Sequence, residues 1–161
     1  RSAQTLGLTM NPSRVASTAL LGLLTLHHLA QAATADEIEV RLFYAQSGTF
    51  SEPISEGAEL WNVIAGEQGL REPSTSTFVR VRVSESGAGS RNAGRVVLTV
   101  TDQHTKKRSI LTKHLGAFGP NGVQYVGFWL PNTGCASLRI EAAIAGTASA
   151  VARNIPFRCG E

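Results

Sequence analysis

Apolar and polar residues alternate with a period of two along most of the chain after residue 36. Alternation over about four to eight residues is typical of antiparallel strands that bury one face. We therefore expect half-buried strands at residues 38–44, 79–83, 96–101, 108–115, 138–144 and 151–157. The alternation is weakest at 108–115.

Two segments depart from this simple alternation. Residues 123–130, Val-Gln-Tyr-Val-Gly-Phe-Trp-Leu, are apolar on both faces, and we interpret them as a central strand covered on both sides. Residues 59–65 are ambiguous, because their apolar positions suit a helix capped by Ser55 and ended by Gly66, whereas their length also suits a strand. We favour the strand.

Connections rich in Gly, Pro and Ser separate these runs, and no long helical pattern occurs between them. About seven or eight short strands at this spacing predict an all-β domain, an immunoglobulin-like antiparallel β-sandwich of two sheets. A β-barrel or a jelly roll is the alternative. The absence of an internal repeat or a second pattern predicts one domain over residues 33–161.

The apolar residues near the start of the chain form a pattern of a different kind. Arg14 precedes an apolar run at 15–26, and a small-x-small triplet ends at Ala32. This order is typical of a signal peptide, which we place at residues 10–32, and the run is shorter than the roughly 20 residues of a spanning helix. Residues 1–9 precede Met10 and fit only as upstream sequence. We expect a periplasmic or secreted protein with no stable membrane insertion after cleavage.

Cleavage changes the charge of the chain. The whole sequence has 15 Lys and Arg against 12 Asp and Glu, and loss of Arg1 and Arg14 leaves 13 against 12, a net charge of +1. This balance gives little reason to expect nucleic acid as a partner. Acids dominate residues 33–72 and bases dominate residues 73–161, so we expect the two segments to pack against each other with partial neutralisation.

Cys135 and Cys159 predict a structural disulfide, since an even number of cysteines in an exported protein favours pairing. We expect the last two strands to pair as Leu138 with Phe157, Ile140 with Ile155 and Ile144 with Val151. This register leaves the cysteines one position from direct opposition, and a bulge near Pro156 closes the difference. The bridge would then hold the open end of a terminal hairpin.

The sequence offers little material for catalysis. After the leader it contains His104 and His114 as its histidines and Asp36 and Asp102 as its aspartates, with no serine in a Gly-x-Ser-x-Gly elbow. A metal site needs three or four ligands, and Asp102 with the two histidines is the only convenient cluster, since we expect both cysteines to be used in a disulfide. We therefore expect a protein that is not an enzyme and has no catalytic residue, metal or cofactor.

Two sets of residues are candidates for binding. Trp61, Tyr125 and Trp129 are aromatic residues that could offer a sugar platform or a contact for a protein, and the basic residues are Lys106, Lys107, Arg108 and Lys113. The leading hypothesis is a non-enzymatic binding or adaptor domain that engages another extracytoplasmic protein. The alternatives are a module that binds polysaccharide or another polyanion, and a small secreted hydrolase or hydrolase inhibitor.

Overall fold

The computed structural model describes residues 33–67, 70–85 and 94–160. The predicted signal peptide at 10–32 and the upstream residues 1–9 lie outside these ranges. Within them the regular elements are β1 (Thr34–Tyr44), β2 (Thr49–Phe50), β3 (Leu60–Trp61), a 3₁₀ turn (Val63–Ala65), β4 (Ser76–Ser84), β5 (Arg95–Asp102), β6 (Arg108–His114), β7 (Val123–Pro131), β8 (Leu138–Ile144), β9 (Ala150–Ile155) and β10 (Phe157–Arg158).

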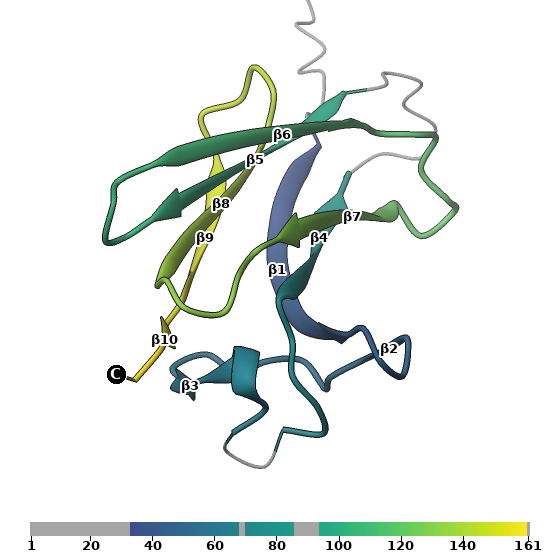
Figure 1. Cartoon of the computed structure of the whole chain (residues 1–161). Helices are drawn as coiled ribbons and strands as arrows, with labels where there is room; N and C mark the ends of the chain where they lie inside the picture. Colours follow the sequence, from purple (N-terminus) through teal and green to yellow (C-terminus); the bar gives the residue numbers. More distant parts are fainter. Residues whose placement is uncertain (1–32, 68–69, 86–93, 161) are drawn as a thin grey trace, which may run out of the picture.

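Most of these strands form two packed sheets (Figure 1). Sheet I has the order β2-β1-β4-β7 and sheet II the order β6-β5-β8-β9, with antiparallel pairing throughout. The chain passes from β4 in sheet I to β5 and β6, returns for β7, and crosses again to β8 and β9. The predicted immunoglobulin-like sandwich is confirmed, and over the described residues the strands make two sheets rather than one closed barrel.

The alternating residues of both sheets meet in one core, as the period-two pattern predicts. The apolar side chains that are completely inaccessible to solvent come from both layers and from the 3₁₀ turn, and are Val40, Val63, Val79, Val81, Val83, Val96, Leu98, Ile140 and Ala142. Burial of a Val, Leu or Ile side chain stabilises a fold by about 1.5–3 kcal/mol. These positions therefore contribute much of the drive to bring the sheets together.

β7 differs from its prediction as a central strand covered on both sides, which was wrong. It pairs with β4, and no other described strand lies on its far side, so it forms an edge of sheet I. Val126 and Phe128 point into the core, whereas Tyr125 and Trp129 are 54% and 43% exposed. An apolar outward face does not by itself require a covering layer, and here the described chain provides none.

The pairing of the last two long strands also differs from the prediction. Leu138 lies opposite Ile155 and Ala142 opposite Val151, a shift of two residues from the expected register. The strand still buries the expected face, because a shift by two residues preserves the alternation of side chains. The register is set by a tight turn in which Gly146 has φ 86° and the amide of Thr147 donates to the carbonyl of Ile144 at 3.1 Å.

The chain leaves sheet II at Pro156, which has no N–H to donate. Phe157 then pairs with Leu60 in a short parallel ladder of β10 with β3, and the amide of Asn62 donates to the carbonyl of Arg158 at 2.8 Å. The ambiguous segment 59–65 is thus a two-residue strand followed by a 3₁₀ turn, which Gly66 ends with φ 75°. The favoured strand is therefore present only at Leu60–Trp61, and the alternative helix capped by Ser55 does not form, although Gly66 does end the 3₁₀ turn.

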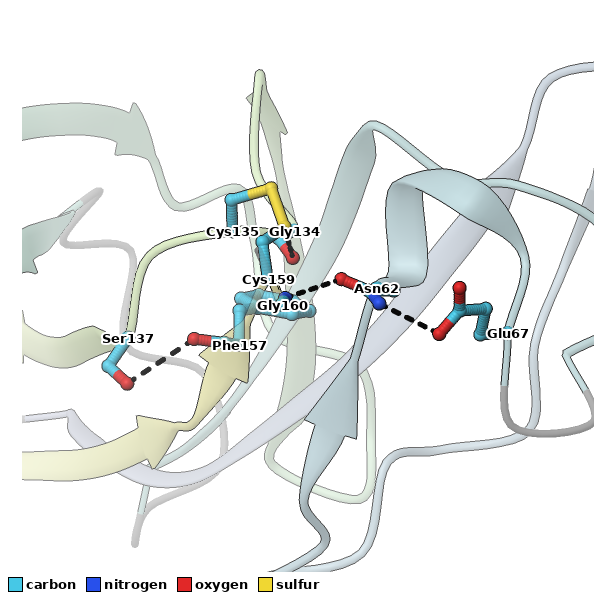
Figure 2. The surroundings of a disulfide bond; sticks show 8 residues. All are labelled: Asn62, Glu67, Gly134, Cys135, Ser137, Phe157, Cys159 and Gly160. Carbon is cyan, nitrogen blue, oxygen red and sulfur yellow. Dashed lines mark hydrogen bonds between the residues drawn. A yellow bond between two sulfur atoms is a disulfide. The ribbon is translucent and has the colours of Figure 1, made fainter.

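Cys135 and Cys159 form the disulfide, with 4.9 Å between their Cα atoms (Figure 2). Cys159 follows β10, so the bridge joins the β7–β8 connection to the segment beside β3, and not the two ends of one hairpin as expected. A hydrogen bond of 2.7 Å from the amide of Gly160 to Oδ1 of Asn62 adds to this attachment. The C-terminal segment is therefore held covalently and by backbone pairing.

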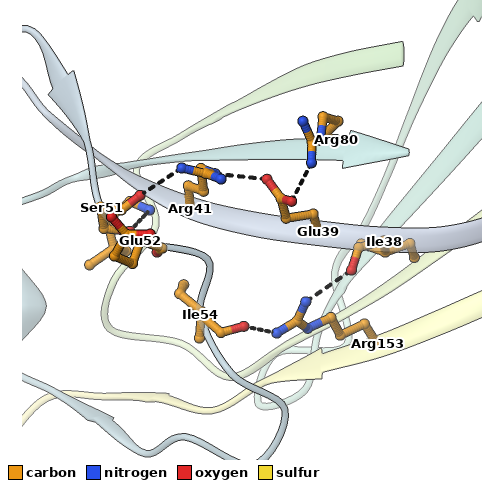
Figure 3. Close-up of polar contacts among 9 residues, drawn as sticks. Ile38, Glu39, Arg41, Ser51, Glu52, Ile54, Arg80 and Arg153 are labelled. Carbon is orange, nitrogen blue, oxygen red and sulfur yellow. Dashed lines mark hydrogen bonds and ion pairs between the residues drawn. The ribbon is translucent and has the colours of Figure 1, made fainter. Parts of the chain in front are cut away.

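One side of the sandwich is closed by an arginine. Arg153 on β9 is half-buried and donates from Nη1 to the carbonyl of Ile38 at 2.9 Å and from Nη2 to the carbonyl of Ile54 (Figure 3). These bonds connect sheet II to β1 of sheet I and to the β2–β3 connection. The opposite side, where β6 and β7 are the edge strands, is called the open edge below.

Candidate binding surface

The outer face of sheet I carries a group of aromatic side chains. They come from all four of its strands and are Phe43, Phe50, Phe78, Tyr125 and Trp129, here called the aromatic patch. Phe50, Tyr125 and Trp129 are 44%, 54% and 43% exposed, and the other two are half-buried. The strand register brings them together, because it places Phe78 opposite Trp129 and Phe43 opposite Phe50.

Four of the five rings of the aromatic patch contact one another edge to face or tilted, whereas Tyr125 contacts Arg80. The ring centroids of Phe43 and Trp129 are 4.7 Å apart at an interplanar angle of 68°. Phe50 lies 5.4 Å from Phe43 and 5.2 Å from Phe78, with angles of 56° and 49°. Such pairs contribute about 0.5–1.5 kcal/mol beyond the burial of their area. The rings therefore support one another as a preformed apolar surface.

Gly127 makes room for this arrangement. A Cβ atom added to Gly127 would lie 2.5 Å from Cζ and 2.8 Å from Cε2 of Phe78, so the phenyl ring occupies the space of the missing side chain. Tyr125 and Trp129 flank Gly127 on the same face of β7. Phe78 thereby occupies the space over Gly127, at the position between Tyr125 and Trp129 on this face.

Charged residues border the aromatic patch along β1 and β4. Glu39 accepts hydrogen bonds from Nε of Arg41 at 2.7 Å and from Nη2 of Arg80 (Figure 3). The guanidinium of Arg80 also lies 4.7 Å from the ring centroid of Tyr125. Burial by itself raises the pKa of the Glu39 carboxyl, but the hydrogen bonds and positive charges of the two arginines outweigh it and lower that pKa. The arginines are thus fixed in position beside the aromatic rings.

A second ion pair lies further along the same two strands, where Arg82 contacts Asp36 at 2.8 Å. Acids of β1 therefore face bases of β4, which matches the expectation that the acidic early segment packs against the basic later one. The ion pairs neutralise most of the charge at this end of the sheet face and leave the aromatic patch as its most distinctive feature.

The basic residues predicted from sequence lie on the other sheet. Lys106 and Lys107 belong to the β5–β6 turn, whereas Arg108 and Lys113 lie on β6, and all four are exposed. The Lys113 ammonium approaches the ring of Phe128 at 5.6 Å across the open edge. The structure thus separates the basic set from Tyr125 and Trp129, and the two sets adjoin only where β6 and β7 face each other.

Trp61 lies apart from both sets. It is half-buried on β3, its indole N–H donates to Oε2 of Glu59 at 3.5 Å, and the guanidinium of Arg158 is 5.4 Å from its ring. It borders a shallow depression of about 580 Å³ beside the disulfide. Of the three aromatic residues singled out from sequence, only Tyr125 and Trp129 therefore share a surface.

The two histidines lie apart, His104 in the β5–β6 turn beside Asp102 and His114 at the far end of β6, opposite Arg95. His104 and His114 are exposed, and Oδ1 of Asp102 accepts hydrogen bonds from the backbone amides of His104 and Thr105 at 2.8 and 2.9 Å. The hydrogen bond from the backbone amide of Thr105 is the largest cause of the lowered pKa of Asp102. The two hydrogen bonds to the Asp102 side chain stabilise the β5–β6 turn. The described residues contain no group of three or more His, Cys, Asp or Glu side chains able to hold a metal ion.

Three residues of the aromatic patch were not singled out from the sequence. Phe43 and Phe78 have a detectable signal, because each occupies an outward position in a strand whose neighbouring outward positions are charged. Phe50 lies in a two-residue strand and has no such signal. An aromatic residue on the polar side of an alternating strand is therefore the feature that would have identified the surface.

No protein-family model matches this chain, and no curated protein is similar to it. No helix in the described part of the chain is long and apolar enough to span a membrane. The fold and the surface define the class of protein. It is an immunoglobulin-like β-sandwich with one disulfide, and the outer face of its sheet I carries the aromatic patch.

Proposed function

We propose that this protein is a non-enzymatic, exported binding domain that engages another extracytoplasmic protein through the aromatic patch. The observation that carries the proposal is the exposure of Phe50, Tyr125 and Trp129 on one sheet face. Aromatic side chains and arginine are the residues most enriched among those that dominate protein–protein binding. Here Arg80 stacks on Tyr125, so both kinds of residue occur together.

The arrangement of the rings favours a protein partner over a polysaccharide. A sugar ring stacks on the flat face of an aromatic side chain, whereas the rings of Phe43 and Trp129 meet at 68° and those of Phe50 and Phe78 at 49°. Edge-to-face rings make a compact apolar surface of uneven height, suited to apolar side chains of a protein. The ion pairs of Glu39 and Asp36 then supply a polar rim.

The proposed location is the periplasm or the extracellular space. The disulfide fits an oxidising compartment, and the predicted signal peptide at 10–32 provides the route. In such a compartment the partner is another exported protein or the exposed part of a membrane protein.

Site-specific photocrosslinking in the producing cell tests this proposal. A photoreactive phenylalanine analogue replaces Tyr125 or Trp129 in the full-length protein, and Ala152, an exposed residue of β9 in sheet II, serves as the matched control. We expect one discrete adduct of defined mass from both β7 positions after illumination and none from Ala152. Trp129→Ala should reduce the adduct from position 125 by at least about tenfold, since truncation of a central aromatic contact costs about 2 kcal/mol or more.

Equal crosslinking from Ala152, or an adduct formed only with polysaccharide, would contradict the proposal. Tyr125→Phe provides a further control, because it preserves the ring and removes the hydroxyl. Its adduct from position 129 should match that of the wild type within about twofold if ring contact dominates.

A further inference from the structure

The edge strand β6 presents unpaired backbone groups at alternate residues. The carbonyl of Lys107 accepts from the amide of Asp102 at 3.0 Å, and the amide of Leu115 donates to the carbonyl of Gly94 at 2.9 Å, so odd-numbered residues bond to β5. Hydrogen-bonded pairs recur every second residue in an antiparallel ladder. The even-numbered residues of β6 therefore direct N–H and C=O away from sheet II, and they are Arg108, Ile110, Thr112 and His114.

Over the described residues, no strand or apolar side chain is seen to cover this edge. Ile110, in the middle of β6, is 59% exposed, and within the described residues no strand pairs with β6 other than β5. Edge strands of stable proteins are commonly short, bulged or covered, because an uncovered edge accepts another strand. β6 runs over seven residues and pairs with β5 in regular register without a bulge.

A groove lies along the open edge, between β6 and the end of β7. It has a volume of about 410 Å³, and its apolar lining includes Leu111 from β6 and Trp129 and Leu130 from β7. A strand added beside β6 would direct every second side chain toward this groove, since successive side chains point to opposite faces. The site therefore suits an extended segment with apolar residues at alternate positions.

The positive charge along β6 and the β5–β6 turn favours binding of an acidic segment. Lys106, Lys107, Arg108 and Lys113 are exposed, and among the described residues no carboxylate forms an ion pair with any of them. A second copy of this chain is a poor occupant, because antiparallel pairing centred on Ile110 would place Lys107 opposite the second copy's Lys113. Like charges opposed across strands are destabilising.

We propose that β6 is a second docking site, which binds an extended acidic peptide segment of another protein by adding it to sheet II as a strand. The backbone of the even-numbered residues supplies hydrogen bonds, and the groove takes alternate apolar side chains beside Leu111. The carboxylates of the added strand point to the opposite face, where Arg108 lies, while Lys107 and Lys113 lie on the groove face on either side of Leu111 and attract the acidic segment at longer range. This proposal does not rest on the aromatic patch. Because Trp129 borders both surfaces, the test of the β6 site substitutes residues of β6 only.

The test uses a fluorescein-labelled peptide of about eight residues in which Glu and Val alternate, matching the length of β6. Its binding to the mature protein is followed by fluorescence anisotropy, with the corresponding Lys and Val peptide as the charge control. We expect the acidic peptide to bind at least about tenfold more tightly than the basic one, with a Kd that rises with salt. Double charge reversal, Lys107→Glu with Arg108→Glu, should remove this preference.

Thr112→Pro separates backbone pairing from simple charge attraction. Proline removes an N–H that points away from β5, and Thr112→Val, which retains the N–H, is the matched control. We expect Thr112→Pro to weaken peptide binding about fivefold relative to Thr112→Val, the loss of about one hydrogen bond. Equal affinity of the two variants would overturn strand addition.

Hydrogen exchange and a competing polyanion provide two further tests of strand addition at β6. If Thr112→Pro does not fold, amide hydrogen exchange of the wild type replaces it, and the peptide should slow exchange at Ile110 and Thr112; unchanged exchange there would overturn the proposal. A sulfated polysaccharide is the competing ligand. If it binds while the acidic peptide does not, the site is a polyanion site and the peptide proposal is wrong.

Discussion

The phenyl ring of Phe78 on β4 lies in the space that a side chain on Gly127 of β7 would fill, with its Cζ atom 2.5 Å from the position of an added Cβ. This relationship is a side-chain contact between the two strands on the outer face of sheet I, at the position between Tyr125 and Trp129 on β7. It also makes Gly127 a position at which the aromatic patch can be altered without removing any of its rings.

Gly127→Ala should therefore displace Phe78 and lower the free energy of unfolding by about 1–3 kcal/mol, as is usual for insertion of a methyl group into filled space. Gly160→Ala is the matched control, because its added Cβ meets no atom closer than 3.4 Å. Urea unfolding measures the stability, and the near-ultraviolet circular dichroism reports on the rings. Equal stability of the two variants would show that Phe78 does not occupy this space.

The disulfide should contribute about 3 kcal/mol to stability, as expected for closing a loop of this size, since the two cysteines are 24 residues apart. Replacement of both Cys135 and Cys159 by Ser tests this by urea unfolding. Amide exchange should increase most at β10 and β3, which the bridge holds together. A loss spread evenly over both sheets would argue against a local attachment.

Arg153→Met should destabilise the closed side of the sandwich by about 1–3 kcal/mol, because it leaves the carbonyls of Ile38 and Ile54 without their donor. Arg139→Met is the comparison, since it removes an exposed ion pair with Glu141, worth less than about 1 kcal/mol. Thermal unfolding of the two variants in the same buffer measures the difference. A larger effect at Arg139 would contradict the role assigned to Arg153.

Glu39 should make stability depend on pH in acid. Its folded-state pKa lies below the ordinary value of 4.5, so the stability that it contributes is fully present above about pH 4.5 and is lost as the pH falls through its folded-state pKa. Glu39→Gln should be less stable than the wild type at neutral pH and should lose less stability on acidification. Urea unfolding across this range checks the sign, with Glu141→Gln as the exposed control. A parallel dependence in the wild type and Glu39→Gln would contradict it.

The layers of the fold could be predicted because its strands alternate strictly. Val79, Val81 and Val83 have charged residues between them, so their buried face is defined before any partner strand is known. The expected pairing of β8 with β9 was wrong by two residues, since the same face is buried in either register and the deciding turn at Gly146 has no strong sequence signal.

The candidate surface could be predicted only in part. Tyr125 and Trp129 were recognised as aromatic residues, but alternation cannot distinguish a strand covered on both sides from an edge strand with an aromatic outer face. The contacts with Phe43 and Phe78 depend on the order β1-β4-β7, which brings together segments far apart in the chain. Strand order follows from long-range packing and not from local pattern.

The sulfur bridge also determines how the protein would carry mechanical tension. When force is applied between β1 and Gly160, the covalent path of tension runs from Cys159 through the disulfide to Cys135. The strands β8, β9 and β10 lie in the loop that the disulfide closes, so tension along the chain does not pass through them. The strain falls instead on β1, β4 and the strands up to β7. Under force, the oxidised molecule can lengthen only by the chain that precedes Cys135, and reduction would release the rest.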